Sequence, residues 1–421
     1  MISPTKSLGL VFGIALALAP HFASANDEQV LRRREYRDPV DIAKKLQRIQ
    51  KVFPVRTVDK SHRFKRLGPF PDRANFDPTY ELNGNRYSMA DFHRRTLTSA
   101  FLVLKDDLIV SELYLEGSSA STRFLGYSLA KSFTSTLVGM AIEDGLIQGV
   151  HDPLTKYLPA LTGGVYGGVT IQDALQMLSG AEFMEFEGND YDWRNEAIPA
   201  SRVYQAAMVD QKYRYNEAAN TLRRKFAPRT QFHYSDMDAS LLGALIENAT
   251  GMRLATYMQK KLWEPAGMEH DAYWALDGPP EIGREVAALG FAASLRDYGR
   301  FGLLALHRGR LNGRQLVSEK WFAEATSPQH PAVGFGKLYP DYPLAYGYCW
   351  WILPNGDFTG QGAFGHFVYV APRANVVIVK HSHWPKEWVD EMEMETAVFF
   401  DAVVAALGET GGGKSNVQAD P

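Results

Sequence analysis

Residues 99–146 read SAFLVLKDDLIVSELYLEGSSASTRFLGYSLAKSFTSTLVGMAIEDGL, and this stretch changes from a strand pattern to a helix pattern. Residues 100–104 are apolar, the next three are polar, and residues 108–115 mix β-branched, aromatic and charged side chains. Two such runs around a short polar break predict an antiparallel hairpin. Apolar residues then recur at spacings of three and four over residues 128–146, which predicts a helix.

Helix signals continue through residues 150–274. Thr170 is the predicted cap of one helix, because threonine there precedes an apolar helical pattern. Two further helices are predicted at residues 239–249 and 253–263, and Gly251 between them is a stop signal for the first. The middle of the chain is therefore predicted to be mostly helical.

Strand patterns return near the C-terminus at residues 346–353, 367–370 and 376–381. Because strands at both ends enclose a helical middle, the sequence predicts an α+β fold, with an antiparallel sheet flanked by helices and an inserted helical domain. A functional site is expected in the cleft between the two parts. The predicted division is a signal peptide (1–25), an N-terminal arm (26–84), a sheet domain (85–148 and 286–407), a helical domain (149–285) and a disordered tail (408–421).

The charge of the chain is nearly balanced, with 45 Lys and Arg against 48 Asp and Glu, for a formal net charge of −3. This balance gives no electrostatic footprint for nucleic acid, so no such partner is expected. Residues 31–66 are locally basic, but acidic residues are interleaved, and we interpret the segment as a solvated surface arm. Its basic residues include Arg32, Arg33, Arg34, Lys44, Lys45, Lys51, Arg63, Lys65 and Arg66.

The first 25 residues have the pattern of a secretory signal. Lys6 is followed by an apolar run at residues 8–19 and by small residues that predict cleavage after Ala25. The apolar run is shorter than the ~20 residues of a membrane span, which disfavours the alternatives of a retained anchor or a buried helix. We expect a periplasmic or secreted protein without a membrane span after cleavage. Its single cysteine, Cys349, lies among aromatic residues and is expected to be packed in a strand.

Ser128-Leu129-Ala130-Lys131 lies at the start of a predicted helix. Residues three apart share a helix face, so the hydroxyl of Ser128 and the amine of Lys131 can meet. Ser128 could simply be an N-cap, but a capping box has Glu or Gln where this chain has a lysine. A cation in the first turn opposes the helix dipole, and the same field is expected to lower the pKa of Lys131.

Two later motifs complete the candidate chemistry. Tyr234-Ser235-Asp236 immediately precedes a predicted helix, and a tyrosine hydroxyl near an ammonium can shuttle protons. The triplet is not specific, because Tyr36-Arg37-Asp38 and Tyr339-Pro340-Asp341 have the same form. The run 359–362 (TGQG) has small residues that would let a strand edge approach a substrate closely, although a flexible hairpin loop is the alternative.

In this order, Ser128-Leu129-Ala130-Lys131, Tyr234-Ser235-Asp236 and Thr359-Gly360 resemble the three motifs of class C β-lactamases and their penicillin-binding-protein relatives. Among these relatives, the chain most resembles esterases and amidases of the 6-aminohexanoate-dimer hydrolase type. Each motif is weak alone, and jointly they are specific. Four further stretches look like family sequence: 170–180 (TIQDALQMLSG), 267–274 (GMEHDAYW), 294–302 (SLRDYGRFG) and 346–351 (YGYCWW).

The resemblance implies an acyl-enzyme mechanism that uses neither a metal nor a cofactor. In it, Ser128 attacks the carbonyl of a small-molecule ester or amide while Lys131 and Tyr234 handle its proton. The oxyanion would be bound by the N–H of Ser128 and by one N–H of Gln361 or Gly362. Water then releases the acyl group.

This chain departs from the family pattern at three positions. Phe358 stands where the lactamases carry a cation, which argues against a dedicated β-lactamase. Asp236 stands where the family usually has Asn, which would change hydrogen bonding to an amide substrate. Dimer hydrolases tend to have Gly-Gly-Gln where this chain reads Phe364-Gly365-His366, so His366 is a candidate substrate contact, although a surface histidine is the alternative.

Other readings remain open at this point. Gly126-Tyr127-Ser128-Leu129-Ala130 approximates the nucleophile elbow of an α/β-hydrolase, but that fold gives Lys131 no role. A true β-lactamase or peptidase, and a catalytically silent cell-wall-binding protein, are further alternatives. His381 and His383 lack a partner cluster that would favour a metal. Four aromatic residues suggest an aromatic-lined cleft, which core packing explains equally well: Tyr191, Trp193, Trp350 and Trp351.

Overall fold

The structure is a computed structural model that describes residues 27–71, 73–184, 192–336 and 343–409. The predicted signal peptide, residues 410–421 of the predicted tail and Tyr191 lie outside these residues. Among the described helices, none is long and apolar enough to cross a bilayer.

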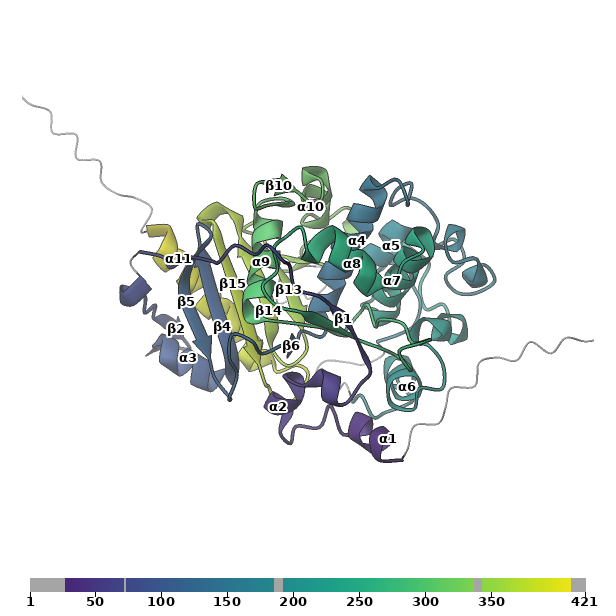
Figure 1. Ribbon diagram of the computed structural model, residues 1–421, viewed down its shortest axis with the longest axis horizontal. Helices are drawn as coiled ribbons and strands as arrows, with labels where there is room; N and C mark the ends of the chain where they lie inside the picture. The colour runs from purple at the N-terminus through teal and green to yellow at the C-terminus, as the bar shows by residue number, and fades with distance from the viewer. Residues whose placement is uncertain (1–26, 72, 185–191, 337–342, 410–421) are drawn as a thin grey trace, which may run out of the picture.

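A seven-stranded antiparallel sheet forms the centre of the fold (Figure 1). β4 (Thr98–Lys105) and β5 (Leu108–Tyr114) form the predicted hairpin, and β15 (Val376–Ser382) pairs with β4. Strands from the two ends of the chain are therefore neighbours, and the predicted α+β fold is confirmed. The order continues from β15 through β14 (His366–Ala371), β13 (Phe358–Gly362) and β12 (Trp351–Ile352) to β11 (Ala345–Tyr346).

One face of this sheet is covered by two helices, one from the N-terminal part of the chain and one from the C-terminal part. α3 (Met89–Arg95) and α11 (Asp390–Glu409) pack there, and the rings of Phe92 and Phe399 stack with centroids 3.9 Å apart. The opposite face packs against α9 (Leu295–Leu306). Because both faces are covered, β4 is a continuous apolar run and does not alternate.

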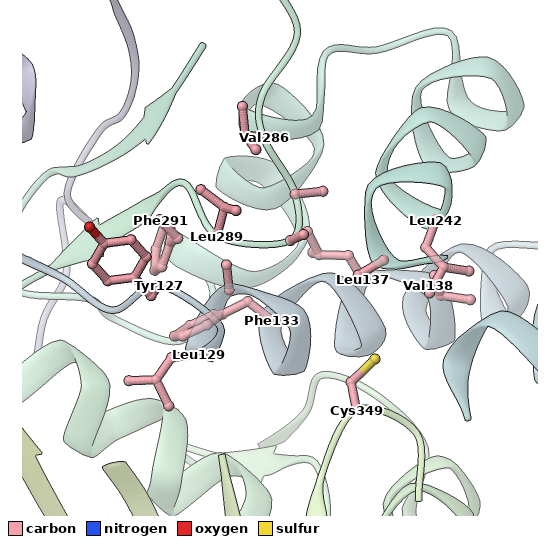
Figure 2. Close-up of a cluster of buried hydrophobic side chains, with 14 of the residues drawn as sticks. Tyr127, Leu129, Phe133, Leu137, Val138, Leu242, Val286, Leu289, Phe291 and Cys349 are labelled. Carbon is pink, nitrogen blue, oxygen red and sulfur yellow. The ribbon is translucent and has the colours of Figure 1, made fainter. Parts of the chain in front are cut away.

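α4 (Leu129–Glu143) joins the sheet to the helical part of the molecule. Its Phe133 ring stacks on Phe301 of α9 at 3.7 Å, and its other side packs against α7 (Asp236–Thr250). Figure 2 shows Phe133 and Leu137 among apolar side chains from several segments, with Cys349 approaching the opposite side of the helix. α4 is buried on nearly every side, so its motif residues are held in a rigid environment.

The predicted helices of the middle region are present. Thr170 caps α5 (Ile171–Leu175): its Oγ accepts a hydrogen bond from the Asp173 amide, and the Asp173 carboxylate accepts one from the Thr170 amide. Gly251 ends α7 in the left-handed conformation, with φ 66°. The helix predicted at 253–263 is α8 (Leu254–Met258) followed by a π-helical turn.

The remaining elements surround this core. β1 (Val55–Val58), β7 (Ala272–Ala275), β8 (Phe291–Ala293) and β6 (Phe124–Leu125) form a four-stranded sheet in that order. Two small hairpins are β2 (Tyr80–Leu82) with β3 (Asn85–Tyr87) and β9 (Arg310–Leu311) with β10 (Arg314–Gln315). The other helices are α1 (Asp27–Arg34), α2 (Ile42–Leu46), α6 (Pro199–Tyr204) and α10 (Glu319–Ala325), and short 3-10 or π turns lie at Ile49–Lys51, Arg73–Asn75, Leu154–Lys156, Pro159–Leu161, Gln205–Val209, Tyr215–Thr221, Gln259–Trp263, Pro331–Val333 and Pro372–Ala374.

The interpretation of residues 31–66 as a solvated arm is wrong in part. Most of the basic side chains there are exposed, but Arg33 is 3% exposed and donates hydrogen bonds to the Val209 carbonyl and the Gln211 side chain. β1 lies within this segment and pairs with β7. Apolar residues between the charges, such as Tyr36 and Phe53, enter the main core, which draws the segment onto the body.

The strand predicted at residues 346–353 is interrupted. Its ends form β11 and β12, and a tight turn between them places Cys349 at φ 61°. The Cys349 amide donates to the carbonyl of Leu175, so the turn is fixed by a contact from the helical part. Cys349 is buried as expected, but it lies in this turn.

Candidate active site

The serine lies where β6 leads into α4. Tyr127 has φ 46°, a conformation that costs a non-glycine residue ~1–2 kcal/mol, and such strain tends to occur at functional sites. Ser128 is the N-cap residue of α4, yet its side chain makes no capping hydrogen bond. Its Oγ instead accepts a hydrogen bond from Lys131 Nζ at 2.7 Å. The capping interpretation of Ser128 is therefore not what the structure shows.

Lys131 is 1% exposed, and its ammonium has three acceptors. Besides Ser128 Oγ, they are Asp236 Oδ1 at 2.6 Å and the Ala288 carbonyl oxygen at 3.0 Å. These contacts satisfy all three N–H donors of a charged lysine. Burial lowers the pKa of Lys131, but the negative charges of Asp236 and Tyr234 outweigh it and raise the pKa above its ordinary value. The expected lowering of the Lys131 pKa is wrong, because the contact with the Asp236 carboxylate favours the charged form of the amine.

Tyr234 completes the group. It lies directly before Ser235, whose Oγ caps α7 by accepting a hydrogen bond from the Asp238 amide. The Lys131 ammonium lies 4.8 Å from the Tyr234 ring centroid. Burial raises the pKa of the Tyr234 phenol above its ordinary value, although the Lys131 charge and hydrogen bonds to Ser128 and Lys131 act in the opposite direction. The structure thus brings together an alcohol, an ammonium and a phenol from two helix starts about a hundred residues apart.

The run 359–362 lies on β13 and is not a loop. A Cβ atom added to Gly362 would lie 2.0 Å from the carbonyl oxygen of Gly126, two residues before Ser128. A Cβ atom on Gly360 would lie 3.1 Å from Ser132 Oγ. The glycines therefore let the strand contact α4 and the segment 126–128, which we call the serine loop.

The polar side chains of this strand do not face the serine. Thr359 pairs with Tyr369 and Gln361 with Phe367, and these partners belong to the cluster on the α3 and α11 face. Residues opposite each other in an antiparallel pair point to the same face, so Thr359 and Gln361 turn their side chains away from α4. The backbone groups of these residues remain available to the site.

His366 is completely buried, which makes the surface interpretation wrong. Its Nδ1 lies 3.1 Å from His381 Nδ1, and its ring stacks behind Tyr127 with a centroid distance of 6.4 Å. Burial lowers the pKa of His366 to about 3, so the ring is neutral at neutral pH. His366 supports the serine loop from behind, and the structure does not place it as a substrate contact.

Aromatic residues form the wall beside the phenol. Trp351 stacks on Tyr234 with centroids 5.8 Å apart, and the half-buried Phe232 lies 5.8 Å from Trp351. Trp350, by contrast, is fully buried and packs against Phe301 in the core. Phe358 is also buried and packs edge-on against Trp350, so an aromatic ring fills that position.

Sequence reasoning missed the Ala288 carbonyl and the pairing of Asp236 with Lys131. A backbone carbonyl has no sequence signature. The pairing of Asp236 with Lys131 did have a signal, because Asp236 is a carboxylate at a position where the family usually has Asn. Within the described residues, no group of three or more His, Cys, Asp or Glu side chains is arranged to hold a metal ion.

The chain is similar to known proteins over most of its length. Residues 83–402 match the family described as Beta-lactamase. The 6-aminohexanoate-dimer hydrolase of Paenarthrobacter ureafaciens is 29% identical over 325 residues, which cover 73% of this chain and 79% of that protein. A β-lactamase of Escherichia coli K12 is 27% identical over 143 residues, covering 34% of this chain and 33% of that protein.

Solved structures show the same fold. A Bacillus anthracis protein described provisionally as a 6-aminohexanoate-dimer hydrolase has a TM-score of 0.78 at 21% identity, over 92% of this chain and 99% of its own. A family VIII carboxylesterase has a TM-score of 0.53 at 17% identity, over 74% of this chain and 96% of its own. The chain belongs to the β-lactamase family, and the relatives that it matches include hydrolases.

Proposed function

We propose that the chain is a serine hydrolase that cleaves an ester or amide bond through a covalent acyl-enzyme on Ser128. The observation that carries the proposal is the contact of Ser128 Oγ with Lys131 Nζ at 2.7 Å beside the Tyr234 phenol. An alcohol becomes a nucleophile when an adjacent group can take its proton. The names of two relatives, a dimer hydrolase and a carboxylesterase, support an amide or ester as the scissile bond.

The proton route follows from the charges around Lys131. The ammonium is held by Asp236, so Lys131 is charged and the proton acceptor is assigned to Tyr234. Its reactive form is the phenolate, the minor form at neutral pH because burial raises the pKa of the phenol. The Ser128 oxygen forms a bond to the carbonyl carbon while its proton moves to the Tyr234 oxygen. The C=O π electrons move to the oxyanion, which collapses and expels the leaving group with the proton from Tyr234. Attack by water reverses these steps and frees Ser128.

The oxyanion is assigned to the N–H of Ser128 and one N–H from the end of β13, at Gln361 or Gly362. The close approach of Gly362 to Gly126 supports this assignment, because it places the end of β13 against the serine loop. Fixed backbone donors of this kind stabilise the charge that develops in the transition state.

Covalent labelling tests the nucleophile. A fluorophosphonate is expected to add to Ser128 in the folded protein, with one adduct found by mass analysis of the peptide. Ser128→Ala should abolish the adduct, whereas Ser135→Ala, a change of a buried serine in the same helix, should retain it. The absence of an adduct on the wild-type protein would support a catalytically silent binding protein.

Phe358 leads to a prediction about substrate class. A buried aromatic ring at this position offers no charge to a substrate carboxylate, so short-chain aryl esters should be turned over faster than nitrocefin-type lactams. The measurement is kcat/KM for both substrates on one preparation, with linear amides as a third series. Faster turnover of the lactam would instead favour the β-lactamase or peptidase alternative.

Asp236 should set the pH range of the reaction. Its charge raises the pKa of both Lys131 and Tyr234, and Asp236→Asn should lower both. The phenolate then forms at lower pH and the ammonium is lost at lower pH, so the whole pH profile of kcat/KM moves downward. Asp144→Asn is the matched control, because Asp144 pairs with Lys261 at the same 2.6 Å but on the surface. An unmoved or upward-shifted profile in Asp236→Asn would contradict the proton route.

The antiparallel sheet rules out the α/β-hydrolase alternative, whose nucleophile elbow requires a parallel sheet.

We also propose that the protein is exported, on the pattern of Lys6 and residues 8–19. N-terminal sequencing of the protein recovered from periplasm or medium should begin at Asn26. Recovery of the intact N-terminus would favour a retained anchor.

A further inference from the structure

We propose that Arg37, in the N-terminal segment, is a positioning residue that holds both sides of the oxyanion site in place. The proposal rests on the proposed function and adds a residue that lies outside the region matched by the family. Arg37 is 7% exposed, and its guanidinium forms an ion pair with Glu387 at 3.1 Å in which both side chains are nearly buried.

The first set of contacts joins Arg37 to the serine loop. The Arg37 guanidinium carbon lies 5.6 Å from the ring centroid of Tyr127, the residue directly before Ser128. It also lies 4.8 Å from the Tyr204 ring and 5.8 Å from the Trp193 ring, which belong to the helical part of the molecule. A planar cation among three rings fixes their relative positions. Tyr127 has φ 46°, and a strained conformation persists only when its surroundings enforce it.

The second set of contacts joins Arg37, through Glu387, to the turn that follows β13. The Glu387 carbonyl accepts a hydrogen bond from the Phe364 amide at 2.9 Å, and Phe364 lies in the turn between β13 and β14. The Phe364 ring packs against the Tyr127 ring with centroids 5.3 Å apart. This turn directly follows Gly362, whose backbone touches Gly126. The Arg37–Glu387 pair thus connects the loop that carries Ser128 to the strand that supplies the second N–H.

Arg33 provides a matched control for the experiment. It is an arginine of the same segment, is 3% exposed, and bonds to Val209 and Gln211. Arg33→Ala should weaken the packing of the N-terminal segment without changing the contacts of the serine loop or of the β13–β14 turn. Glu387→Gln is the second variant, because the amide keeps the size of the side chain and leaves the backbone bond to Phe364 available.

Arg37→Ala is expected to lower kcat for an aryl ester by about 10- to 100-fold with little change in KM, because donors that move away from the oxyanion weaken only the transition state. Glu387→Gln should lower kcat in the same way by a smaller factor. Arg33→Ala should keep kcat within about twofold of the wild type, even where its Tm falls. All assays are run at least 15 °C below the Tm of each variant.

Hydrogen exchange gives a readout that does not depend on catalysis. Peptides covering residues 360–367 should exchange faster in Arg37→Ala and in Glu387→Gln than in Arg33→Ala. A raised KM with unchanged kcat would assign Arg37 to substrate binding and overturn the proposal, as would equal kcat losses in Arg37→Ala and Arg33→Ala. Wild-type labelling of Ser128 tests the proposed function separately, so unchanged exchange with normal labelling rejects the positioning role alone.

Discussion

Lys131→Ala should lower kcat/KM for a short-chain aryl ester by about three orders of magnitude, close to the loss expected for Ser128→Ala. The variant removes the charge that stabilises the Tyr234 phenolate and the donor that orients Ser128 Oγ. It also leaves the Asp236 carboxylate without its counter-charge. Steady-state kinetics of both single variants and of the double variant measure the effect. The double variant should lose little more than either single one, because the residues act as a unit.

Lys261→Ala is the control for this prediction, since Lys261 pairs with Asp144 at the surface and should retain full activity. Circular dichroism and Tm must show that Lys131→Ala is folded, because Lys131 is buried in α4. A folded Lys131→Ala protein with kcat/KM within tenfold of the wild type would refute the role of the lysine.

Gly362→Ala should lower kcat by about 10²- to 10³-fold, the loss typical of removing one oxyanion donor. The added Cβ atom would lie 2.0 Å from the Gly126 carbonyl oxygen. The Cβ atom is bonded directly to the backbone, and the carbonyl oxygen is part of it. No side-chain rotation can relieve this overlap, so the end of β13 must move away from the serine loop. The kinetics should show a loss in kcat and a slower reaction with a fluorophosphonate.

Gly149→Ala is the matched control, because a Cβ atom there meets nothing within 4 Å and the residue does not need the left-handed conformation. This variant should show wild-type kinetics and a Tm that is unchanged or slightly raised, since alanine reduces the entropy of the unfolded chain. Wild-type kcat in a folded Gly362→Ala protein would show that the end of β13 does not contribute to the oxyanion site.

The sequence was most informative where the decisive interactions are local. The 98–114 hairpin and α4 follow from runs of apolar residues with periods that the chain can satisfy alone. Thr170 and Gly251 behaved as predicted for the same reason, because a cap depends on residues three or four positions away. Failures began where a distant segment decides the outcome, as at residues 346–353, where a bond from Cys349 to Leu175 fixes a turn within an apolar run.

The candidate site shows the same division. Ser128, Lys131 and Tyr234 were found by their order and helix context, and the structure brings their side chains together. The direction of the Lys131 pKa shift was wrong, because it depends on Asp236 at 2.6 Å, a residue 105 positions away. Thr359 and Gln361 lie on a strand as predicted, but only the register of that strand shows that their side chains face away from α4.

The sequence by itself determined the kind of fold and the candidate residues of the site, because periodicity, capping and motif order are properties of neighbouring residues. The tertiary structure alone decided the charge state of Lys131, the burial of His366 and the inclusion of Arg37 behind the serine loop. Each of these depends on burial and on charges a few ångströms away in space. Such distances are set only when remote segments pack together, so no local pattern contains them.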